Sequence, residues 1–250
     1  MVEVVEWGSG PPAVFVHGSV FDAEMAWETQ RPLADGHRLR LVNRRGFGNS
    51  PDALGEDFEI DAADVAAVLG DGAHLVGHSY GAVAALLAAA RRPTAVWSLT
   101  VIEPPAFALV ADRRDVRAFM ARIQSLVQEE LSPEDFLRLF IVAVGGDPGR
   151  LPTPLPPRLA KGASLLMRGR PPSEAIIPLD ELAALDCPKL VISGDHSAIF
   201  DAVCDALVSG IGAERVVLPG AGHSVPLVGE PFNEALRACW AKVPLATVRQ

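Results

Sequence analysis

The sequence predicts an α/β fold, in which a mostly parallel sheet is covered by helices on both faces. Short runs rich in Val, Ile and Leu recur along the chain, and stretches of helical character separate them. The chain has 250 residues, of which 49 % are hydrophobic, so it can bury one sizeable core. We therefore expect a single domain.

Seven apolar runs have the length and composition of buried strands, and Gly or Pro punctuation follows most of them. We expect strands at residues 2–7, 13–16, 39–43, 74–76, 99–102, 189–192 and 215–218. Helices are expected between them at residues 61–69, 81–91, 199–208 and 232–242. The helix over 81–91 has the clearest signal, because its Ala-rich body combines high helix propensity with side chains small enough to pack closely on a sheet.

Residues 104–185 break this alternation. They hold two amphipathic segments, 112–128 and 132–144, then a Pro-rich run, and we expect a further helix at 158–167. Proline fixes φ and removes a hydrogen-bond donor, so the run is interpreted as a stiff connector. We predict one domain with its core at 1–103 and 186–250 and an inserted helical cap at about 104–185.

Charge and composition exclude several classes of function. Lys and Arg number 22 against 31 Asp and Glu, and the net charge of -9 repels phosphate backbones and anionic membrane surfaces. We therefore expect a small-molecule substrate and neither nucleic acid nor a membrane as partner. No apolar window reaches the length of a membrane span, and no basic region precedes an apolar run at the N-terminus, so a cytoplasmic location is expected.

The cysteines and histidines show no metal-binding pattern. Cys187, Cys204 and Cys239 are widely spaced and fit no Cys-x-x-Cys motif, and no His-Glu-x-x-His motif occurs. We expect neither a metal nor another cofactor.

The most informative motif is Gly77-His78-Ser79-Tyr80-Gly81, which fits the pattern G-x-S-x-G. It lies directly between a Val-rich strand and the Ala-rich helix. The chain must turn so sharply there that a Cβ atom at position 77 or 81 would collide with neighbouring backbone, while Ser79 is held strained and exposed. The motif therefore predicts Ser79 as a nucleophile above the edge of the sheet.

At this motif the chain resembles the α/β-hydrolase superfamily, and the resemblance extends from His17-Gly18 through Ser79 to Gly222-His223. It implies the α/β-hydrolase fold, with the helical cap inserted after the sixth strand. In that family a strand ending in His-Gly opens the oxyanion loop. The resemblance thus implies the backbone N–H groups of Ser19 and Tyr80 as the two oxyanion donors, with His17 bracing the loop.

A second segment, Arg44-Arg45-Gly46-Phe47-Gly48-Asn49-Ser50, resembles the Gly-x-Gly-x-Ser loop that follows the fourth strand of the same family. Its glycines allow a tight turn, and it does not lead into a phosphate-binding Gly-Lys-Ser/Thr sequence. We expect a structural role for it.

The general base should follow the last strand, where Ala221-Gly222-His223-Ser224 lies at the expected place. His223 is therefore the predicted base. The acid has two candidates. The usual acid position after the strand at 189–192 holds Ser197, with Asp195 two residues early, whereas Glu103 ends the strand at 99–102, where some family members carry their acid. A carboxylate at an apolar strand end requires a partner, so we favour Glu103 and keep Asp195 as the alternative.

This set of residues predicts a serine hydrolase that cleaves a carboxylic ester or a lactone. C–C bond hydrolysis, thioester hydrolysis and amide hydrolysis on the same triad remain open, as does a hydrolase-like ligand-binding protein with little turnover. Some apolar side chains of the cap should line the substrate pocket, and the rest should pack against the core. The candidates are Phe107, Leu109, Phe119, Met120, Phe136, Leu139, Phe140, Leu165 and Met167.

Overall fold

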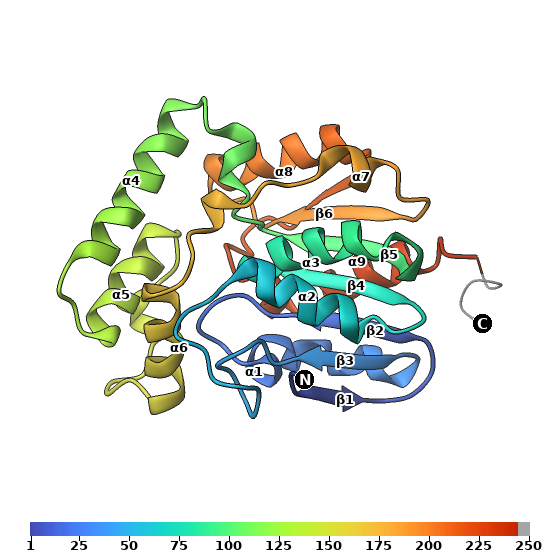
Figure 1. The fold of residues 1–250 in the computed structure, drawn as a ribbon, viewed down its shortest axis with the longest axis horizontal. Coiled ribbons are helices and arrows are strands. Elements are labelled where there is room, and N and C mark those ends of the chain that lie inside the picture. The colour runs from blue at the N-terminus through green and yellow to red at the C-terminus, as the bar shows by residue number, and fades with distance from the viewer. Residues whose placement is uncertain (245–250) are drawn as a thin grey trace.

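The computed structural model describes residues 1–244, and a seven-stranded sheet lies at its centre (Figure 1). The strand order is β1-β3-β2-β4-β5-β6-β7, and every neighbouring pair is parallel except β1 with β3. All seven expected strands are confirmed, with ends that differ by at most three residues. They are β1 (Val4–Trp7), β2 (Pro12–Val16), β3 (Arg38–Val42), β4 (Ala73–His78), β5 (Val96–Ile102), β6 (Lys189–Ser193) and β7 (Glu214–Val217).

Helices cover both faces of this sheet, as the alternating pattern predicts. One face packs against α2 (Phe58–Val68), α3 (Tyr80–Arg91), α7 (Leu179–Ala183) and α8 (Ala198–Ile211). The other face packs against α1 (Ala23–Trp27), the 3-10 helix over Glu28–Asp35 and α9 (Glu230–Trp240). The short helices α1 and α7 and the 3-10 helix were not expected, because they are too short to show a helical period.

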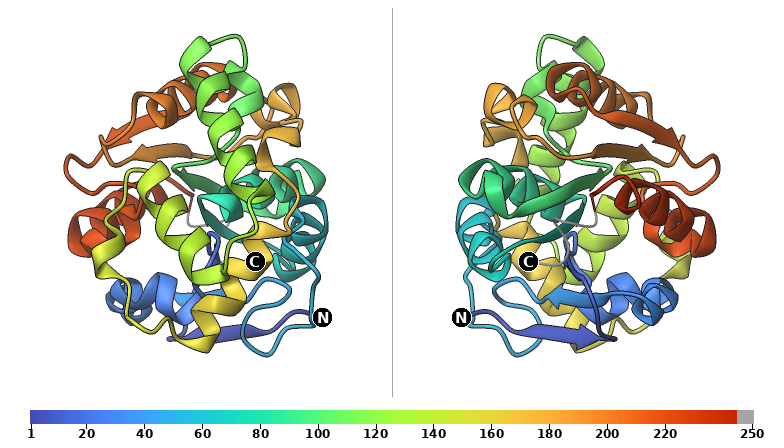
Figure 2. Two further views of the ribbon diagram at one scale, coloured as in Figure 1. Left: turned by 90° about the vertical axis from the view of Figure 1, so that its left-hand side faces the viewer. Right: turned by 90° about the vertical axis from the view of Figure 1, so that its right-hand side faces the viewer.

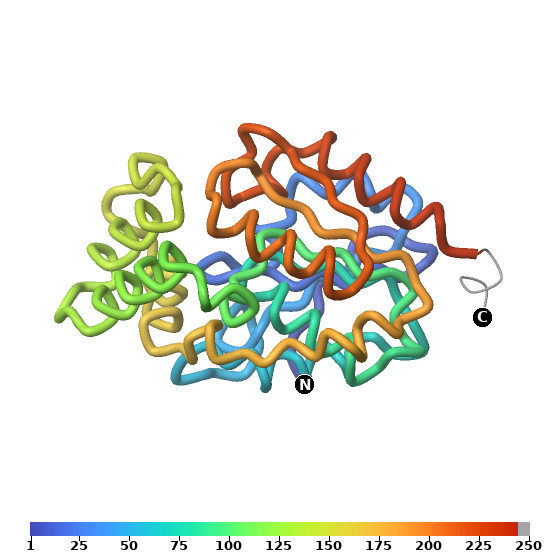
Figure 3. The backbone as a smooth tube through the Cα atoms, turned by 90° about the horizontal axis from the view of Figure 1, so that it is seen from above, coloured from blue at the N-terminus to red at the C-terminus, as the bar shows by residue number. Residues whose placement is uncertain are grey.

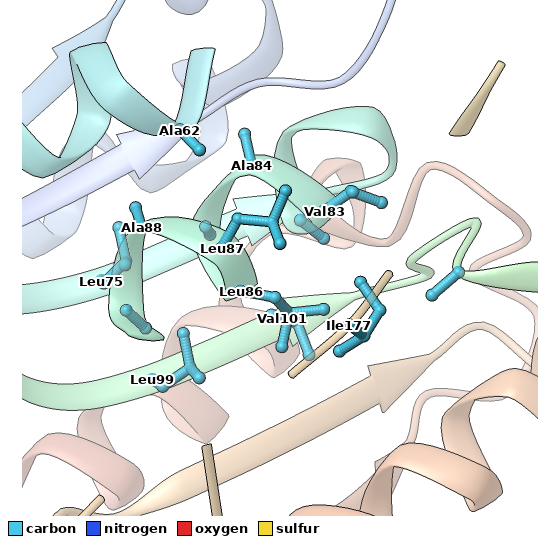
Figure 4. Close-up of a cluster of buried hydrophobic side chains, with 14 of the residues drawn as sticks. Ala62, Leu75, Val83, Ala84, Leu86, Leu87, Ala88, Leu99, Val101 and Ile177 are labelled. Atoms are coloured by element: carbon cyan, nitrogen blue, oxygen red, sulfur yellow. The ribbon is translucent and has the colours of Figure 1, made fainter. Parts of the chain in front are cut away.

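The core between α3 and the central strands is made of small and branched apolar side chains (Figure 4). Ala84 and Ala88 of α3 and Ala62 of α2 are fully buried, and they let the two helices approach each other closely. On the side of the sheet, Leu75 of β4 and Val101 of β5 complete the cluster. This packing fixes the position of α3 relative to the end of β4.

The segment between β5 and β6 forms three further helices that lie beyond the carboxyl ends of the parallel strands (Figure 1). They are α4 (Arg114–Gln128), α5 (Pro133–Ala143) and α6 (Pro157–Met167), and each matches an expected helix within two residues at either end. Seen end-on, α4 and α5 stand in front of the sheet, and seen from above they lie beside the layered core (Figures 2 and 3). The insertion follows β5, which is the expected strand at residues 99–102.

Parallel strands bring several loops to one edge of the sheet, and this geometry positions the site. Ser79 follows β4, Glu103 follows β5, His196 lies three residues after β6, and His223 lies in the loop after β7. In open α/β sheets this carboxyl edge is the usual place of the ligand crevice. Within the described residues, no helix is both long and apolar enough to cross a membrane.

Candidate active site

Ser79 lies in a strained turn between β4 and α3. Its φ of 51° and ψ of -125° place it in a region that non-glycine residues rarely adopt. The flanking glycines are required by close backbone contacts. A Cβ atom on Gly77 would lie 2.7 Å from the carbonyl oxygen of Gly81, and one on Gly81 would overlap the carbonyl oxygens of Val16 and His17. The sequence-based expectation for these two glycines therefore agrees with the contacts around them.

The structure brings Ser79, His223 and Glu103 together from three separate loops. Nε2 of His223 is 2.9 Å from Oγ of Ser79, and Nδ1 of His223 is 3.4 Å from Oε2 of Glu103. With the ring proton on Nδ1, facing the carboxylate, Nε2 is left free to accept the proton of the Ser79 hydroxyl. The arrangement can therefore activate a hydroxyl as a nucleophile.

Glu103 is fully buried, and its backbone has a φ of 48°. Oε1 accepts a hydrogen bond of 2.7 Å from the backbone N–H of Gly194. Burial alone would raise the pKa of this carboxyl group, but contacts with His196 and His223 and the Gly194 amide outweigh burial and lower the pKa to about 2. Glu103 is therefore ionised at neutral pH.

The alternative acid, Asp195, lies elsewhere. It is exposed, and in the part of the chain that the structure describes it makes neither a hydrogen bond nor an ion pair with His223. Its positive φ of 55° turns the chain between β6 and α8. Of the two candidate acids, only Glu103 contacts the imidazole of His223.

His78, the second residue of the Gly77–Gly81 motif, holds the loop of His223. Its Nε2–H donates a hydrogen bond of 2.8 Å to the backbone carbonyl of His223. Burial lowers the pKa of His78 to about 3, with a smaller contribution from His223, so this ring stays neutral. Because position 78 is the variable second residue of the G-x-S-x-G motif, the motif gave no signal for this contact.

The loop after β2 is braced by buried polar groups. Nδ1–H of His17 donates to the carbonyl oxygen of Gly18 at 2.7 Å, and Nε2 of His17 accepts from the backbone N–H of Arg44 at 3.1 Å. The Arg44 guanidinium, 1 % exposed, donates to the carbonyl oxygens of His17 and Gly18 and to the carboxylates of Glu56 and Asp61. Burial lowers the pKa of His17 well below its usual range, so the ring is neutral as a brace requires.

The carboxylate of Glu56 was not singled out from the sequence, yet it reaches the site. Its Oε1 is paired with Arg44 at 2.6 Å, and its Oε2 accepts a hydrogen bond of 2.7 Å from the hydroxyl of Ser19. Arg44 and Glu56 lie in a loop without helical or strand periodicity, so no pattern in the sequence predicts their contact. The pair holds the loop that carries Ser19.

A cavity of about 360 Å³ opens above Ser79, and Ser19, Tyr80 and His223 are among its lining residues. Its volume falls within the range of small-molecule sites. Of the nine apolar residues proposed from the sequence, five line the cavity: Phe107, Phe119, Met120, Phe136 and Phe140. The other four lie outside its lining, and among them Leu139 is exposed and Leu165 is buried.

Close groups of His, Cys, Asp and Glu side chains are the places where a protein can bind a metal ion. Within residues 1–244, one such group has ligand-type atoms that all lie within 4.8 Å of one another, and it consists of Glu103, His196 and His223. Glu103 and His223 of this group contact each other, and His223 contacts Ser79, in the arrangement of a proton relay. We therefore assign Glu103 and His223 to a proton relay with Ser79.

Comparison with known proteins gives the family. Residues 13–235 match the model of the Alpha/beta hydrolase family. The 2-(acetamidomethylene)succinate hydrolase of Mesorhizobium japonicum is 28 % identical over 243 residues, which cover 90 % of this chain and 85 % of that protein. The crystal structure of an alpha/beta hydrolase from Sphaerobacter thermophilus shares 25 % identity, with a TM-score of 0.67 and coverage of 94 % of this chain and 96 % of the other.

A local match reaches higher identity. The pimeloyl-[acyl-carrier protein] methyl ester esterase of Aeromonas salmonicida is 37 % identical over 109 residues, which are 42 % of this chain and 43 % of that protein. The match to this relative therefore spans less than half of its length. The family match itself extends over most of the chain and agrees with the seven-stranded sheet. The chain therefore belongs to the Alpha/beta hydrolase family.

Proposed function

We propose that this hydrolase cleaves carboxylic esters or lactones of small, largely apolar molecules through an acyl-enzyme on Ser79. The observation that carries the proposal is the 2.9 Å contact between Oγ of Ser79 and Nε2 of His223, with Glu103 on the far side of the imidazole ring. A nucleophile, a base and an orienting acid in this order are the parts that acyl transfer requires.

The proposed reaction uses these contacts in two stages. His223 takes the hydroxyl proton at Nε2 as Ser79 attacks the carbonyl carbon, and the carbonyl becomes an oxyanion. The backbone N–H groups of Ser19 and Tyr80 stabilise that charge, helped by the positive end of α3. His223 then returns the proton to the departing alcohol, and a water molecule, deprotonated by the same imidazole, releases the acid from Ser79.

The lining of the cavity supports an apolar acyl or alcohol group. Aromatic and aliphatic side chains from the helices α4 and α5 face the same cavity as Ser79, whereas the polar lining is shared mainly among Ser19, Glu56, Tyr80 and the segment 170–174. An apolar group in contact with α4 and α5 would leave the ester carbonyl beside Ser79. The similarity to two relatives, a methyl ester esterase and a hydrolase, supports ester cleavage in general terms.

A substrate panel tests the proposal. Purified protein is assayed with p-nitrophenyl esters of increasing acyl length, with aliphatic lactones and with thioesters. We expect ester and lactone hydrolysis with a preferred chain length, and loss of all activity in Ser79→Ala. Hydrolysis confined to thioesters would refute the proposed substrate class, and full activity in Ser79→Ala would refute the nucleophile.

The alternative, a binding protein with the same fold, is separated by covalent labelling. A fluorophosphonate probe reacts with an activated serine, so we expect one label per chain in the wild type and none in Ser79→Ala. A wild-type protein that binds apolar esters without hydrolysing them, and that takes up no label, would favour the binding protein.

A further inference from the structure

His196 presents a buried nitrogen without a hydrogen-bond partner next to the candidate acid. The side chain is 10 % exposed, and Nδ1 has no hydrogen-bond partner among the described residues, although it lies 3.6 Å from Oε1 of Glu103. An unpaired polar atom of this kind costs free energy unless its charge state suits the neighbouring group. The neighbouring group is a carboxylate that also contacts His223.

The other nitrogen of the same ring contacts the end of a cap helix. Nε2 of His196 is 3.1 Å from the carbonyl oxygen of Val144, the residue that ends α5. A carbonyl accepts hydrogen bonds only, so Nε2 must carry a proton. If the ring were neutral, Nδ1 would then be an unprotonated nitrogen facing a carboxylate oxygen, and the two lone pairs would repel each other.

The imidazolium form removes this conflict. With both nitrogens protonated, Nδ1–H points towards Oε1 of Glu103 and Nε2–H donates to Val144. The carboxylate attracts the cation, and so does the negative end of the α5 dipole. The titratable groups around the ring are Glu103, which follows β5, His223, whose ring centre is 5.8 Å away, and Asp201 of α8; α5 contributes the Val144 carbonyl.

We propose that His196 is a positioning residue, which as an imidazolium holds the second carboxylate oxygen of Glu103 and ties the acid to the end of α5. Glu103 then has a fixed orientation, with Oε1 held by His196 and Gly194 and Oε2 directed at His223. Through Val144, the same ring couples the placement of the cap to the acid. The inference rests on the proposed function of the triad.

Proton loss from His196 should weaken this hold. Burial lowers the pKa of this imidazole, but the contacts with Glu103 and Val144 outweigh burial and raise it above the ordinary value. Its contribution is therefore complete below the ordinary pKa of imidazole and is lost as the pH rises through the raised pKa. Turnover should show an alkaline decline that depends on residue 196.

Two substitutions separate the two contacts of the ring. The amide nitrogen of Asn occupies the position of Nδ1, so His196→Asn keeps a donor towards Glu103 and loses the one towards Val144. The amide nitrogen of Gln reaches the position of Nε2, so His196→Gln keeps the donor towards Val144 only. We expect His196→Asn to retain most of the turnover without the alkaline decline, and His196→Gln to lose about tenfold.

Nuclear magnetic resonance of the ring nitrogens in Ser79→Ala provides a readout that needs no activity. We expect His196 to be protonated on both nitrogens at pH 7, and its titration to move to lower pH when Glu103→Gln is added. A neutral His196 ring at pH 7 overturns the proposal. The proposal is also overturned if the His196→Asn and His196→Gln variants match the wild type in turnover and in pH profile. Failure of every ester substrate would refute the proposed function and leave the resonance result to decide the role of His196.

Discussion

Glu103→Gln removes the charge of the candidate acid while keeping its shape. The backbone N–H of Gly194 donates to Oε1 at 2.7 Å, and in the variant only the amide oxygen can accept this bond. The amide nitrogen must then occupy the place of Oε2, which faces Nδ1 of His223. It donates to that nitrogen, so the ring proton moves to Nε2, and the ring can no longer accept the proton of Ser79.

The size of the expected loss in turnover follows from this change of tautomer. The enzyme keeps its nucleophile, its cavity and its oxyanion donors but holds the base in the wrong form, which in serine hydrolases lowers turnover by about 10⁴. A factor of this size corresponds to about 5 kcal/mol in the activation barrier. We expect kcat to fall by about 10³ to 10⁴ in a variant that stays folded at neutral pH, because it retains the Gly194 hydrogen bond.

The assay is steady-state hydrolysis of the best p-nitrophenyl ester at neutral pH. Asp195→Asn is the matched control, because it changes the exposed carboxylate that competes for the role of acid. We expect the control to stay within about twofold of the wild type, as for a surface substitution. A large loss of turnover in Asp195→Asn, with near-normal turnover in Glu103→Gln, would refute Glu103 as the acid and assign that role to Asp195.

Three further predictions concern the stability of the fold, the role of the cavity and the loss of stability at acidic pH. Arg44→Met should lower the free energy of unfolding by about 3–5 kcal/mol in urea titrations, because it leaves two buried carboxylates unpaired. The Arg45 side chain is 38 % exposed, so Arg45→Met should lower the free energy of unfolding by no more than about 1 kcal/mol. Equal losses in the two variants would contradict the role of the buried ion pairs of Arg44. Met120→Trp narrows the cavity and should raise KM for esters with long acyl chains more than KM for acetate esters. Leu139→Trp, on the exposed side of α5, should leave both KM values unchanged. The same change of KM in both variants would show that the cavity does not hold the acyl chain. The pKa of Glu103 is lowered to about 2, so the stability that its ionised form contributes is complete above the ordinary value of 4.5 and is lost as the pH falls through about 2. Between pH 5 and pH 2 the wild type should therefore lose on the order of 3 kcal/mol more unfolding free energy than Glu103→Gln. A difference in unfolding free energy between the two proteins that does not change with pH would contradict the lowered pKa.

The sequence predicted the parts of the fold that repeat a simple period. Buried parallel strands are unbroken apolar runs, and the amphipathic helices of the cap show their faces over three turns or more. The helix α1 has five residues, and its start is signalled only by the side chain of Asp22, which accepts from the backbone N–H of Met25. Such an element follows from tertiary packing of Trp27 and leaves no period to detect.

The candidate site was predicted where chain order and sheet geometry coincide. Ser79 and His223 follow strands whose ends meet at one edge, and Glu103 follows the strand next to that of Ser79. His196 was not predicted to reach Glu103, because its direction depends on the positive φ of Asp195, which nothing in the local sequence demands. The contact of Glu56 with Ser19 likewise joins residues 37 positions apart through loops. The division of the chain into a core and a cap stays a prediction.

Trapping the covalent intermediate tests the central claim most directly. The enzyme is mixed with a p-nitrophenyl ester, quenched in acid within the first turnovers, digested and analysed by mass spectrometry. We expect one acyl group per chain, on the peptide that contains Ser79, and no acyl group in Ser79→Ala. An acyl group on another residue that turns over at the rate of hydrolysis would contradict Ser79 as the nucleophile.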